Sequence, residues 1–297
     1  MQALSNGMAH IDGEFVPASQ AKISIFDWGF LHSDATYDAA HVWRGKIFRL
    51  DDHINRFLRN IDKLRMEIPY DFDGLRSLLI ECVSRSGIKD AIIEMICTRG
   101  IPESGSRDPR TCKNNFFAFV VPMIWIASPE KQREGLHVII SEKYRIPSSS
   151  VDPTIKNFHW LDMTMGLFEA YDRGGESAIL KDIDGHVAEG PGFNIFAVSG
   201  DRIVTPGRGT LDGITRRTAI ELGKNSGYDV IEGELPVDDI FEADEIFITS
   251  TAGGIIPVTT IDHRKIGSGK PGPVTIALTE KYWALHEDPR YVFPVKY

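Results

Sequence analysis

The sequence of 297 residues has a formal net charge of −9, and 42% of its residues are hydrophobic and 25% charged. This composition is that of a globular protein, and its acidic balance argues against the basic surface that nucleic-acid binding requires. No stretch approaches the roughly 18 apolar residues of a membrane-spanning helix, and residues 1–16 lack the apolar segment of a secretory signal. We therefore expect a cytoplasmic protein whose partners are neither nucleic acid nor membrane.

Short strands and helices are expected to alternate along the first half of the chain. Residues 11–15 predict a β-hairpin with an Asp-Gly turn. An apolar stripe of helical period predicts a helix over 52–66, with Asp51 as its N-cap. A second helix is expected over 73–84. Two almost continuously apolar segments, 91–97 and 116–126, predict strands that are covered on both faces.

A polar segment, 127–135, separates the two halves of the chain. The elements expected after it are strands at 136–141, 177–181, 185–187, 194–198, 202–204 and 245–249, and helices at 160–171, 213–223 and 271–286. Many short strands mixed with helices indicate an α+β (mixed α/β) chain. We predict an N-terminal α/β domain over 1–126, an interdomain linker over 127–135 and a C-terminal α/β domain over 136–297.

Several weaker signals do not support a site. The three cysteines are odd in number and form no C-x-x-C motif, so neither a disulfide framework nor a zinc site is indicated. Residues 267–270 resemble a phosphate loop, but Pro271 follows where such a loop needs Ser or Thr. The run Asp51–His53 could suggest a metal ligand set, but it begins a helix, where negative charge suits the helix dipole. We therefore predict no metal site.

Four short motifs of the second half carry the chemical signal when they are taken together. They are the segments Asp152–Asn157, Val187–Asn194, Gly213–Arg216 and Thr249–Gly254. Each has a structural interpretation when it is taken alone. An isolated lysine is usually a solvated surface charge, and Gly-Ile-Thr is a common helix start.

In this order and spacing, the motifs resemble the fold-type IV pyridoxal-phosphate enzymes. That family contains branched-chain and D-amino-acid aminotransferases, aminodeoxychorismate lyases and (R)-selective amine transaminases. Phe26–Phe30 and Phe48–Arg56 match family elements of the first half, so the resemblance covers almost the whole chain. The run His32–Asp38 and the spacing of Lys156 and Trp160 are most similar to the (R)-selective amine transaminases of fungal type. The resemblance implies the two-domain fold of the family and a pyridoxal 5′-phosphate cofactor.

The resemblance also implies which residues hold the cofactor. Lys156 is the lysine that would form a Schiff base with the cofactor aldehyde and shuttle a proton. Glu189 takes the position of a carboxylate beside the pyridine nitrogen, where negative charge favours the protonated ring. Arg56 lies off the apolar stripe of its helix, on a face that we expect to meet solvent or the second domain. The residues implied for the phosphate, which needs N–H groups and hydroxyls, are Arg56, Ile214, Thr215 and Thr251.

The substrate pocket that the resemblance implies is mainly apolar and aromatic. An enzyme for ordinary amino acids needs a cation or a donor set for the α-carboxylate. The segment Gly29–Ala39 offers only His32 and Tyr37 as obvious donors for it. On composition alone, Ile92 and Trp160 are equally well interpreted as core residues. The residues implied for the pocket are His32, Tyr37, Ala39, Ile92, Trp160, Thr251 and Ala252.

The loop over 101–113 is rich in Gly, Ser and Pro and carries Arg107 and Arg110. In related amine transaminases, an arginine of this loop is thought to turn toward the substrate carboxylate. The aligned position here is Gly105, and Arg107 follows two residues later, so we predict Arg107 as the partner of a keto-acid carboxylate. The resemblance further implies a homodimer in which this loop extends to the partner's site.

These observations predict a transaminase dependent on pyridoxal phosphate. It would move an amino group from an (R)-configured primary amine to a keto acid such as pyruvate, through Lys156. The sequence leaves three alternatives open. The first is an aminotransferase for D-amino acids or branched-chain amino acids, and the second is a carbon–carbon lyase of the aminodeoxychorismate type on the same fold. The third is a binding or regulatory protein that keeps the fold without turnover.

Overall fold

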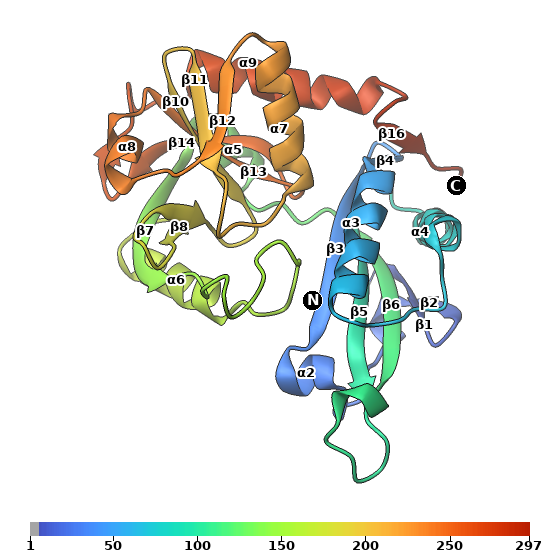
Figure 1. Cartoon of the computed structure of the whole chain (residues 1–297). Helices are drawn as coiled ribbons and strands as arrows, with labels where there is room; N and C mark the ends of the chain where they lie inside the picture. The colour runs from blue at the N-terminus through green and yellow to red at the C-terminus, as the bar shows by residue number, and fades with distance from the viewer. Residues whose placement is uncertain (1–5) are drawn as a thin grey trace. The chain divides into compact units, whose positions relative to one another are not determined.

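The computed structural model describes residues 6–297, which form two compact units (Figure 1). The first unit comprises the chain up to Ile124 together with Ile155–His159 and His286–Tyr297. The second unit comprises Trp125–Thr154 and Trp160–Leu285. The expected division at 127–135 differs from these units, because two short segments of the second half belong to the first unit. Residues 1–5 of the expected N-terminal domain lie outside the described residues.

The first unit is built on one antiparallel sheet. Its strand order is β16-β4-β3-β5-β6-β1-β2. The predicted hairpin at 11–15 is confirmed: Asp12 and Gly13 both have positive φ, 53° and 81°, as a tight two-residue turn requires. The strands are β1 Met8–Ile11, β2 Glu14–Pro17, β3 Ala35–Trp43, β4 Lys46–Phe48, β5 Ala91–Ile101, β6 Lys113–Pro122 and β16 Val292–Pro294.

Helices α3 and α4 cover one face of this sheet (Figure 1). They bury an apolar cluster against alternate residues of β3, β5 and β6, and this cluster includes Phe57, Leu79 and Met95. The expected N-cap Asp51 is wrong, because Asp51 lies inside α3 and Arg49 occupies the cap in a left-handed conformation. The helices of the unit are η1 Ala18–Gln20, α2 Trp28–His32, α3 Leu50–Lys63, α4 Phe72–Ser86, η2 Pro109–Thr111 and η3 Leu285–Glu287, whose first residue falls in the second unit.

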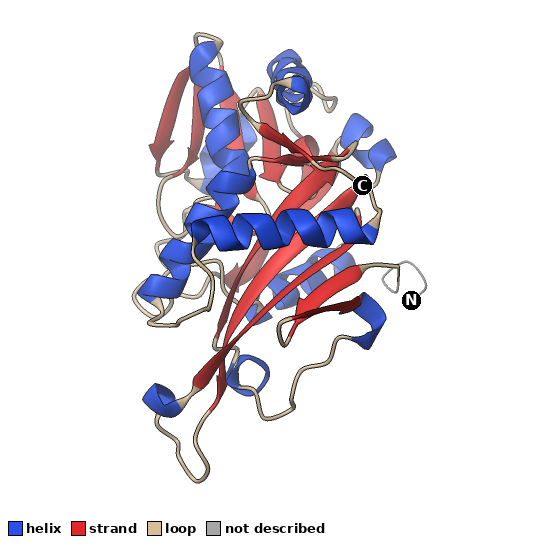
Figure 2. Cartoon of the chain, turned by 90° about the vertical axis from the view of Figure 1, so that its right-hand side faces the viewer, coloured by secondary structure: helices blue, strands red, loops and turns tan. Residues whose placement is uncertain are grey.

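The second unit contains a mixed sheet (Figure 2). Its order is β12-β11-β10-β13-β14-β7-β8-β9, and β15 pairs with β14. The pairs β11–β12, β7–β14 and β7–β8 are parallel and the others antiparallel. The strands are β7 Leu136–Tyr144, β8 Ser177–Lys181, β9 Val187–Glu189, β10 Asn194–Ser199, β11 Arg202–Pro206, β12 Asp229–Gly233, β13 Glu245–Ser250, β14 Gly254–Ile261 and β15 Arg264–Lys265.

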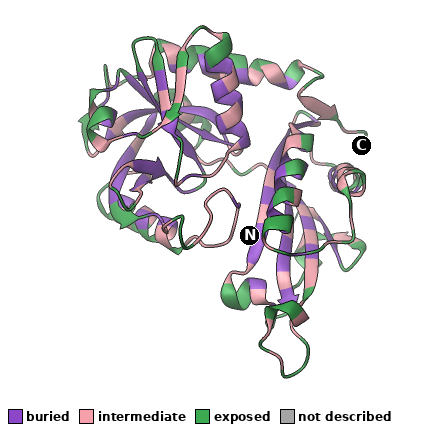
Figure 3. Cartoon of the chain, in the orientation of Figure 1, coloured by how far each residue is buried: buried purple, intermediate pink, exposed green. Residues whose placement is uncertain are grey.

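Helices cover both faces of the mixed sheet, so β13 and β14 are buried along most of their length (Figure 3). Helix α6 packs on β7 and β8, and α9 packs on β13 and β14. The predicted linker at 127–135 is not an open connection, because most of it forms a short helix. The helices of the unit are α5 Pro129–Glu134, α6 Leu161–Asp172, α7 Ile214–Asn225, α8 Val237–Glu242 and α9 Pro273–Ala284.

Two further sequence expectations bear on the core. Cys82 and Cys97, for which the sequence indicated no disulfide framework, are buried free thiols, and burial raises the pKa of each to about 12. Strand β6 is not covered equally on both faces, because fully buried residues alternate along it with partly exposed ones.

In the part of the chain from residue 6 onward, no helix is both long and apolar enough to cross a bilayer.

Candidate active site

Lys156 lies in the first unit, beside the edge of strand β3. Within β3, only Val42 and Trp43 pair with β4, so β4 leaves the start of β3 unpaired on that side. The lysine segment fills this edge: the backbone N–H of Tyr37 donates to the Lys156 carbonyl at 3.0 Å. The Lys156 amine lies 4.2 Å from the centroid of the Tyr37 ring. Lys156 is therefore an anchored, partly buried residue and not a freely solvated surface lysine.

The sheet face beneath this amine collects three of the predicted substrate residues. Successive side chains of a strand alternate between faces, and directly paired residues share a face. Tyr37 pairs with Ile96, Ala39 with Glu94, and Ile92 with His41, so these six residues lie on one face of β3 and β5. The predicted residues Tyr37, Ala39 and Ile92 thus come together with Lys156.

Glu94 is a member of this face that the sequence reasoning missed. Burial raises the pKa of its carboxyl above the ordinary value, although the charge of Lys156 opposes the shift. Among residues 6–297, no hydrogen bond or ion pair joins this carboxyl to another side chain. A desolvated acid without a fixed partner is typical of functional sites. The available signal was a lone carboxylate in the otherwise apolar run Ala91–Cys97.

Arg56 is buried in a cluster with Asp38 and His53. Its Nε and Nη2 atoms donate to the two Asp38 oxygens at 2.7 and 2.8 Å, and His53 Nδ1 lies 2.7 Å from Asp38 Oδ1. Burial alone would raise the pKa of Asp38, but Arg56 and His53 outweigh burial and hold it far below its usual range. Arg56 therefore meets Asp38 of strand β3 in its own unit and is buried, so the expectation that its face meets solvent is wrong.

The same cluster predicts an acid-sensitive fold. Burial lowers the pKa of His53, so the folded state holds this imidazole neutral while the unfolded state protonates it near pH 6.5. Its contribution to stability is complete above that pH and is lost as the pH falls toward the folded-state pKa. We expect His53→Gln to flatten the decline of unfolding free energy between pH 7 and pH 5, measured by urea titration, by up to about 1.4 kcal/mol per pH unit.

The control for this prediction is His137→Gln. His137 also has a pKa lowered by burial, but it lies at a partly exposed position in the second unit. We expect His137→Gln to change the pH dependence of the unfolding free energy between pH 7 and pH 5 less than His53→Gln does. An unchanged slope in His53→Gln would contradict the neutral, buried state of this histidine.

Two predicted substrate residues lie at exposed positions of the first unit. His32 ends helix α2, and its ring contacts Trp28 edge-on at a centroid distance of 4.7 Å. Arg107 lies in the loop of the β5–β6 hairpin, and no ion pair joins it to a residue of the described range. Its neighbour Arg110 pairs with Asp108 in the same loop.

Glu189 lies at the end of strand β9 in the second unit and is buried among hydrogen-bond donors. Arg145 Nε donates to one of its oxygens at 3.2 Å. The hydroxyl of Thr210 and the backbone N–H of Leu211 donate to the other oxygen, at 3.1 and 2.9 Å. Arg145 also pairs with Asp162. A buried carboxylate is stable when it is paired and hydrogen-bonded in this way.

Two glycines of the recognised motifs make this arrangement possible. A Cβ atom on Gly190 would lie 2.4 Å from the Ala178 carbonyl oxygen, so only glycine lets β9 approach β8 and place Glu189. A Cβ atom on Gly213 would lie 2.2 Å from Asn194 Oδ1. The Asn194 amide donates to the Thr210 hydroxyl and the Leu211 carbonyl, which fixes the loop that binds Glu189.

Helix α7 begins directly after Gly213 and has no side-chain cap. The first N–H groups of a helix have no partner within it, so an uncapped start can bind an anion. Ile214 and Thr215 occupy this first turn, and both are buried. The hydroxyl of Thr249, on neighbouring strand β13, is buried without a partner among the described residues. A buried hydroxyl of this kind indicates a polar ligand or water nearby.

The remaining predicted residues lie elsewhere in the second unit. Thr251 and Ala252 form the turn between β13 and β14, where the Ala252 carbonyl accepts from Ile126 at 2.8 Å. Trp160 precedes helix α6 and packs partly buried against the cluster around Met163. The core interpretation of Trp160 therefore has support from this packing.

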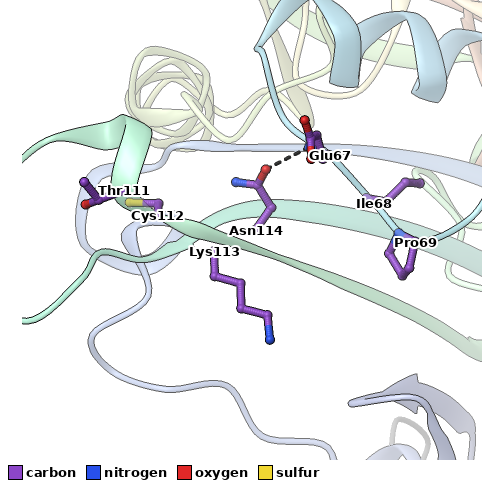
Figure 4. Close-up of a pocket in the computed structure, with 7 residues that line it drawn as sticks. All are labelled: Glu67, Ile68, Pro69, Thr111, Cys112, Lys113 and Asn114. Carbon is purple, nitrogen blue, oxygen red and sulfur yellow. Dashed lines mark hydrogen bonds between the residues drawn. The ribbon is translucent and has the colours of Figure 1, made fainter.

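A hollow of about 480 Å³ on the first unit lies apart from these residues. It is lined by Glu67–Pro69 and Thr111–Asn114, and the Glu67 N–H donates to the Asn114 side chain at 2.8 Å (Figure 4). None of the residues predicted for the cofactor or the substrate lines it. We therefore assign no part of the candidate active site to this hollow.

Comparison with known proteins establishes the family of the chain. Residues 35–261 match the family model described as amino-transferase class IV. The chain is 31% identical to a D-alanine aminotransferase of Bacillus licheniformis over 89% of its length and 92% of the relative. It is 29% identical to a branched-chain-amino-acid aminotransferase of Pseudomonas aeruginosa, over 94% of its length and 93% of the relative. The chain belongs to the class IV aminotransferases.

Solved structures agree with this assignment. A branched-chain amino acid aminotransferase crystallised with pyridoxamine 5′-phosphate superposes with a TM-score of 0.91 at 29% identity, covering 98% of this chain and 99% of that one. The predicted mixed α/β fold of fold type IV is thereby confirmed. Fold-type IV aminotransferases use pyridoxal 5′-phosphate, which confirms the predicted cofactor. The residues present fit it, since the chain offers an anchored amine, a buried carboxylate and an uncapped helix start.

Proposed function

We propose that this aminotransferase moves an amino group from an (R)-configured primary amine to a keto acid such as pyruvate. The observation that supports this choice is the character of the sheet face beneath Lys156. The side chains at positions 37, 39, 41, 92, 94 and 96 include an acid and no arginine or lysine. A face of this kind suits an amine donor that has a hydrophobic group and no carboxylate.

Electrostatics supports the same preference. A substrate carboxylate in a desolvated pocket needs a cationic or hydrogen-bonded partner, because burying an unpaired charge is costly. When Glu94 is ionised, it repels a substrate carboxylate on this face. It does not repel a neutral or cationic amine. The expected hand of the amine rests on the resemblance, because fold-type IV enzymes present one cofactor face to the substrate.

The cofactor supplies the electron sink that weakens the C–H bond next to the amine nitrogen. In our proposal, Lys156 Nζ holds the cofactor covalently between turnovers and then carries the proton from the substrate carbon. The Tyr37 ring keeps this amine close to the sheet face. Glu189 favours a proton on the pyridine nitrogen. The groups proposed to bind the phosphate are Arg56, the first turn of α7 with Ile214 and Thr215, and the Thr251 hydroxyl.

Arg107 is our candidate for the carboxylate of the keto acid. It is exposed on a glycine- and serine-rich loop and has no ion-pair partner in residues 6–297, so its guanidinium is available to an anion. His32, Trp160 and Ala252 complete the proposed substrate set. A homodimer and a cytoplasmic location stay predictions, and the oligomeric state can be measured by analytical ultracentrifugation.

An amino-acid donor is the second candidate. The relatives named above are a D-alanine aminotransferase and a branched-chain-amino-acid aminotransferase. Their similarity extends over most of the chain, which favours the same reaction here. Glu94 and the absence of arginine on the Lys156 face favour the simple amine instead.

A donor screen decides between these two functions. With pyruvate as acceptor, we expect (R)-1-phenylethylamine to give a kcat/KM at least tenfold above that of its (S)-enantiomer. Because the face beneath Lys156 has no arginine or lysine and a donor carboxylate would depend on the exposed Arg107 alone, we also expect it to exceed the values for D-alanine and L-leucine, each measured with 2-oxoglutarate. A clear preference for D-alanine or leucine would replace the proposed donor and leave the aminotransferase assignment intact.

A further inference from the structure

Three hydrogen bonds from other residues of the first unit hold the backbone of Lys156. Its carbonyl accepts hydrogen bonds from the Tyr37 N–H at 3.0 Å and from the Thr36 hydroxyl at 2.8 Å. Its N–H donates to the side-chain oxygen of Asn60 at 3.2 Å when the Asn60 amide is oriented so that both of its polar groups are paired. Thr36 and Asn60 are fully buried. The residue that carries the reactive amine is thus fixed at both of its peptide groups.

The neighbours of Asn60 determine how its amide is oriented. The Lys156 N–H lies on one side and the Arg56 carbonyl on the other, each 3.2 Å away. Only one assignment of nitrogen and oxygen lets the amide donate to Arg56 and accept from Lys156. Asn60 therefore links the helix segment that bears Arg56 to the peptide that bears Lys156.

Packing alone does not account for Asn60. Its position in α3 lies beside the buried apolar residues Phe57 and Ile61. An apolar residue of similar volume would fill this space without burying a polar amide, which is costly unless its hydrogen bonds are made. The amide is satisfied by backbone groups of Arg56 and Lys156. Its distinctive effect is to hold a peptide from a distant part of the sequence.

We propose that Asn60, with Thr36, is a positioning residue that fixes the Lys156 backbone and so determines where its amine reaches. The inference rests on the proposed role of Lys156 as the reactive lysine. Tyr37 reinforces the arrangement, because its N–H binds the Lys156 carbonyl while its ring lies 4.2 Å from the amine. A lysine side chain has many rotamers, so its reach is defined only if its Cα is fixed. Misplacement of a reacting group by about 1 Å costs on the order of a hundredfold in rate.

Amide hydrogen exchange in the cofactor-free protein tests the hydrogen bonds directly. We expect Asn60→Leu to speed exchange in peptides covering 155–159 by roughly three- to tenfold, the loss of one net hydrogen bond. Asn60→Asp keeps an oxygen for the Lys156 N–H, and it should preserve most of the protection. Thr36→Val should speed exchange in the same peptides, whereas Thr36→Ser should not.

A matched control separates positioning from general weakening of the fold. Ile61→Val removes one buried methylene from the neighbouring position of α3 and leaves the Lys156 contacts intact. It should leave exchange at 155–159 at the wild-type rate relative to peptides of strand β5. Faster exchange at 155–159 in Ile61→Val equal to that in Asn60→Leu would overturn the proposal, and so would unchanged exchange in Asn60→Leu.

The loaded enzyme gives the functional readout. We expect Asn60→Leu to lower the single-turnover rate with the amine donor by at least tenfold while the KM changes less, and Asn60→Asp to recover part of the rate. A normal rate in Asn60→Leu would overturn the positioning role. If borohydride fixes the cofactor on another lysine while the exchange result stands, the proposed function of Lys156 fails and the hydrogen-bonded anchor is confirmed.

Discussion

Replacement of Lys156 by alanine should abolish transamination. In the proposed function, the variant loses both the amine that would bind the cofactor covalently and the base that would take the proton from the substrate carbon. General acid–base catalysis alone contributes on the order of 10²–10⁴ in rate, and the loss of covalent catalysis adds to this. We therefore expect at least a thousandfold fall in kcat with the best donor, and no cofactor retained on the chain after borohydride reduction and denaturation.

The matched control is Lys89→Ala. Lys89 also lies in the first unit over a tyrosine ring, 5.9 Å from the centroid of Tyr297, but it is exposed and is not among the predicted site residues. Its removal should leave activity and borohydride labelling at wild-type levels. Peptide mapping of the reduced wild-type protein should locate the label on Lys156, and a label on any other lysine would exclude the assignment.

The sequence predicted the second unit well where short motifs encode short-range structure. Helix α7 begins one residue after the expected position, and β8 has the expected bounds. Glycine explains this success, because Gly190 and Gly213 are required by close approaches that no other residue permits. Strand β14 was not predicted, although it is central to the sheet. It contains Pro257, and proline is unusual inside a central strand because it has no backbone N–H to donate to the ladder.

The sequence could not predict the contacts that join distant segments. Residues 36 and 156 are 120 positions apart, and no local pattern shows that the lysine segment fills the edge of β3. The same reason explains Arg56. The helical period shows that Arg56 lies off the apolar stripe, but only the folded sheet shows that its guanidinium donates to the Asp38 carboxylate. Glu94 was missed because its run was interpreted as core strand, and its paired residue, Ala39, lies 55 positions earlier.

The replacement Glu189→Gln should slow the proton-transfer half-reaction by on the order of a thousandfold while the cofactor stays bound. A carboxylate beside the pyridine nitrogen favours the protonated ring, and the protonated ring is the stronger electron sink. The loss of one preorganised charge at an active site costs roughly 3–4 kcal/mol. Stopped-flow measurement of the amine half-reaction isolates this step from product release.

Glutamine is nearly isosteric, but it cannot satisfy all the donors that surround Glu189. Its single oxygen can face Arg145 or the Thr210–Leu211 loop, and its NH₂ group then meets a donor on the other side. A buried donor without an acceptor costs about 1–3 kcal/mol. We therefore expect a lower melting temperature in Glu189→Gln, in addition to the slower reaction.

Asp162→Asn separates these two effects. Asp162 pairs with the same arginine as Glu189 but leaves the Glu189 carboxylate in place. The variant should lose stability to a similar degree, because a charge on Arg145 loses one of its partners. Its half-reaction should stay within about tenfold of wild type, since the Glu189 charge that we propose to lie beside the ring nitrogen is retained. If both variants slow the reaction equally, Glu189 acts only through the fold. If Glu189→Gln alone is slow, its charge acts on the chemical step.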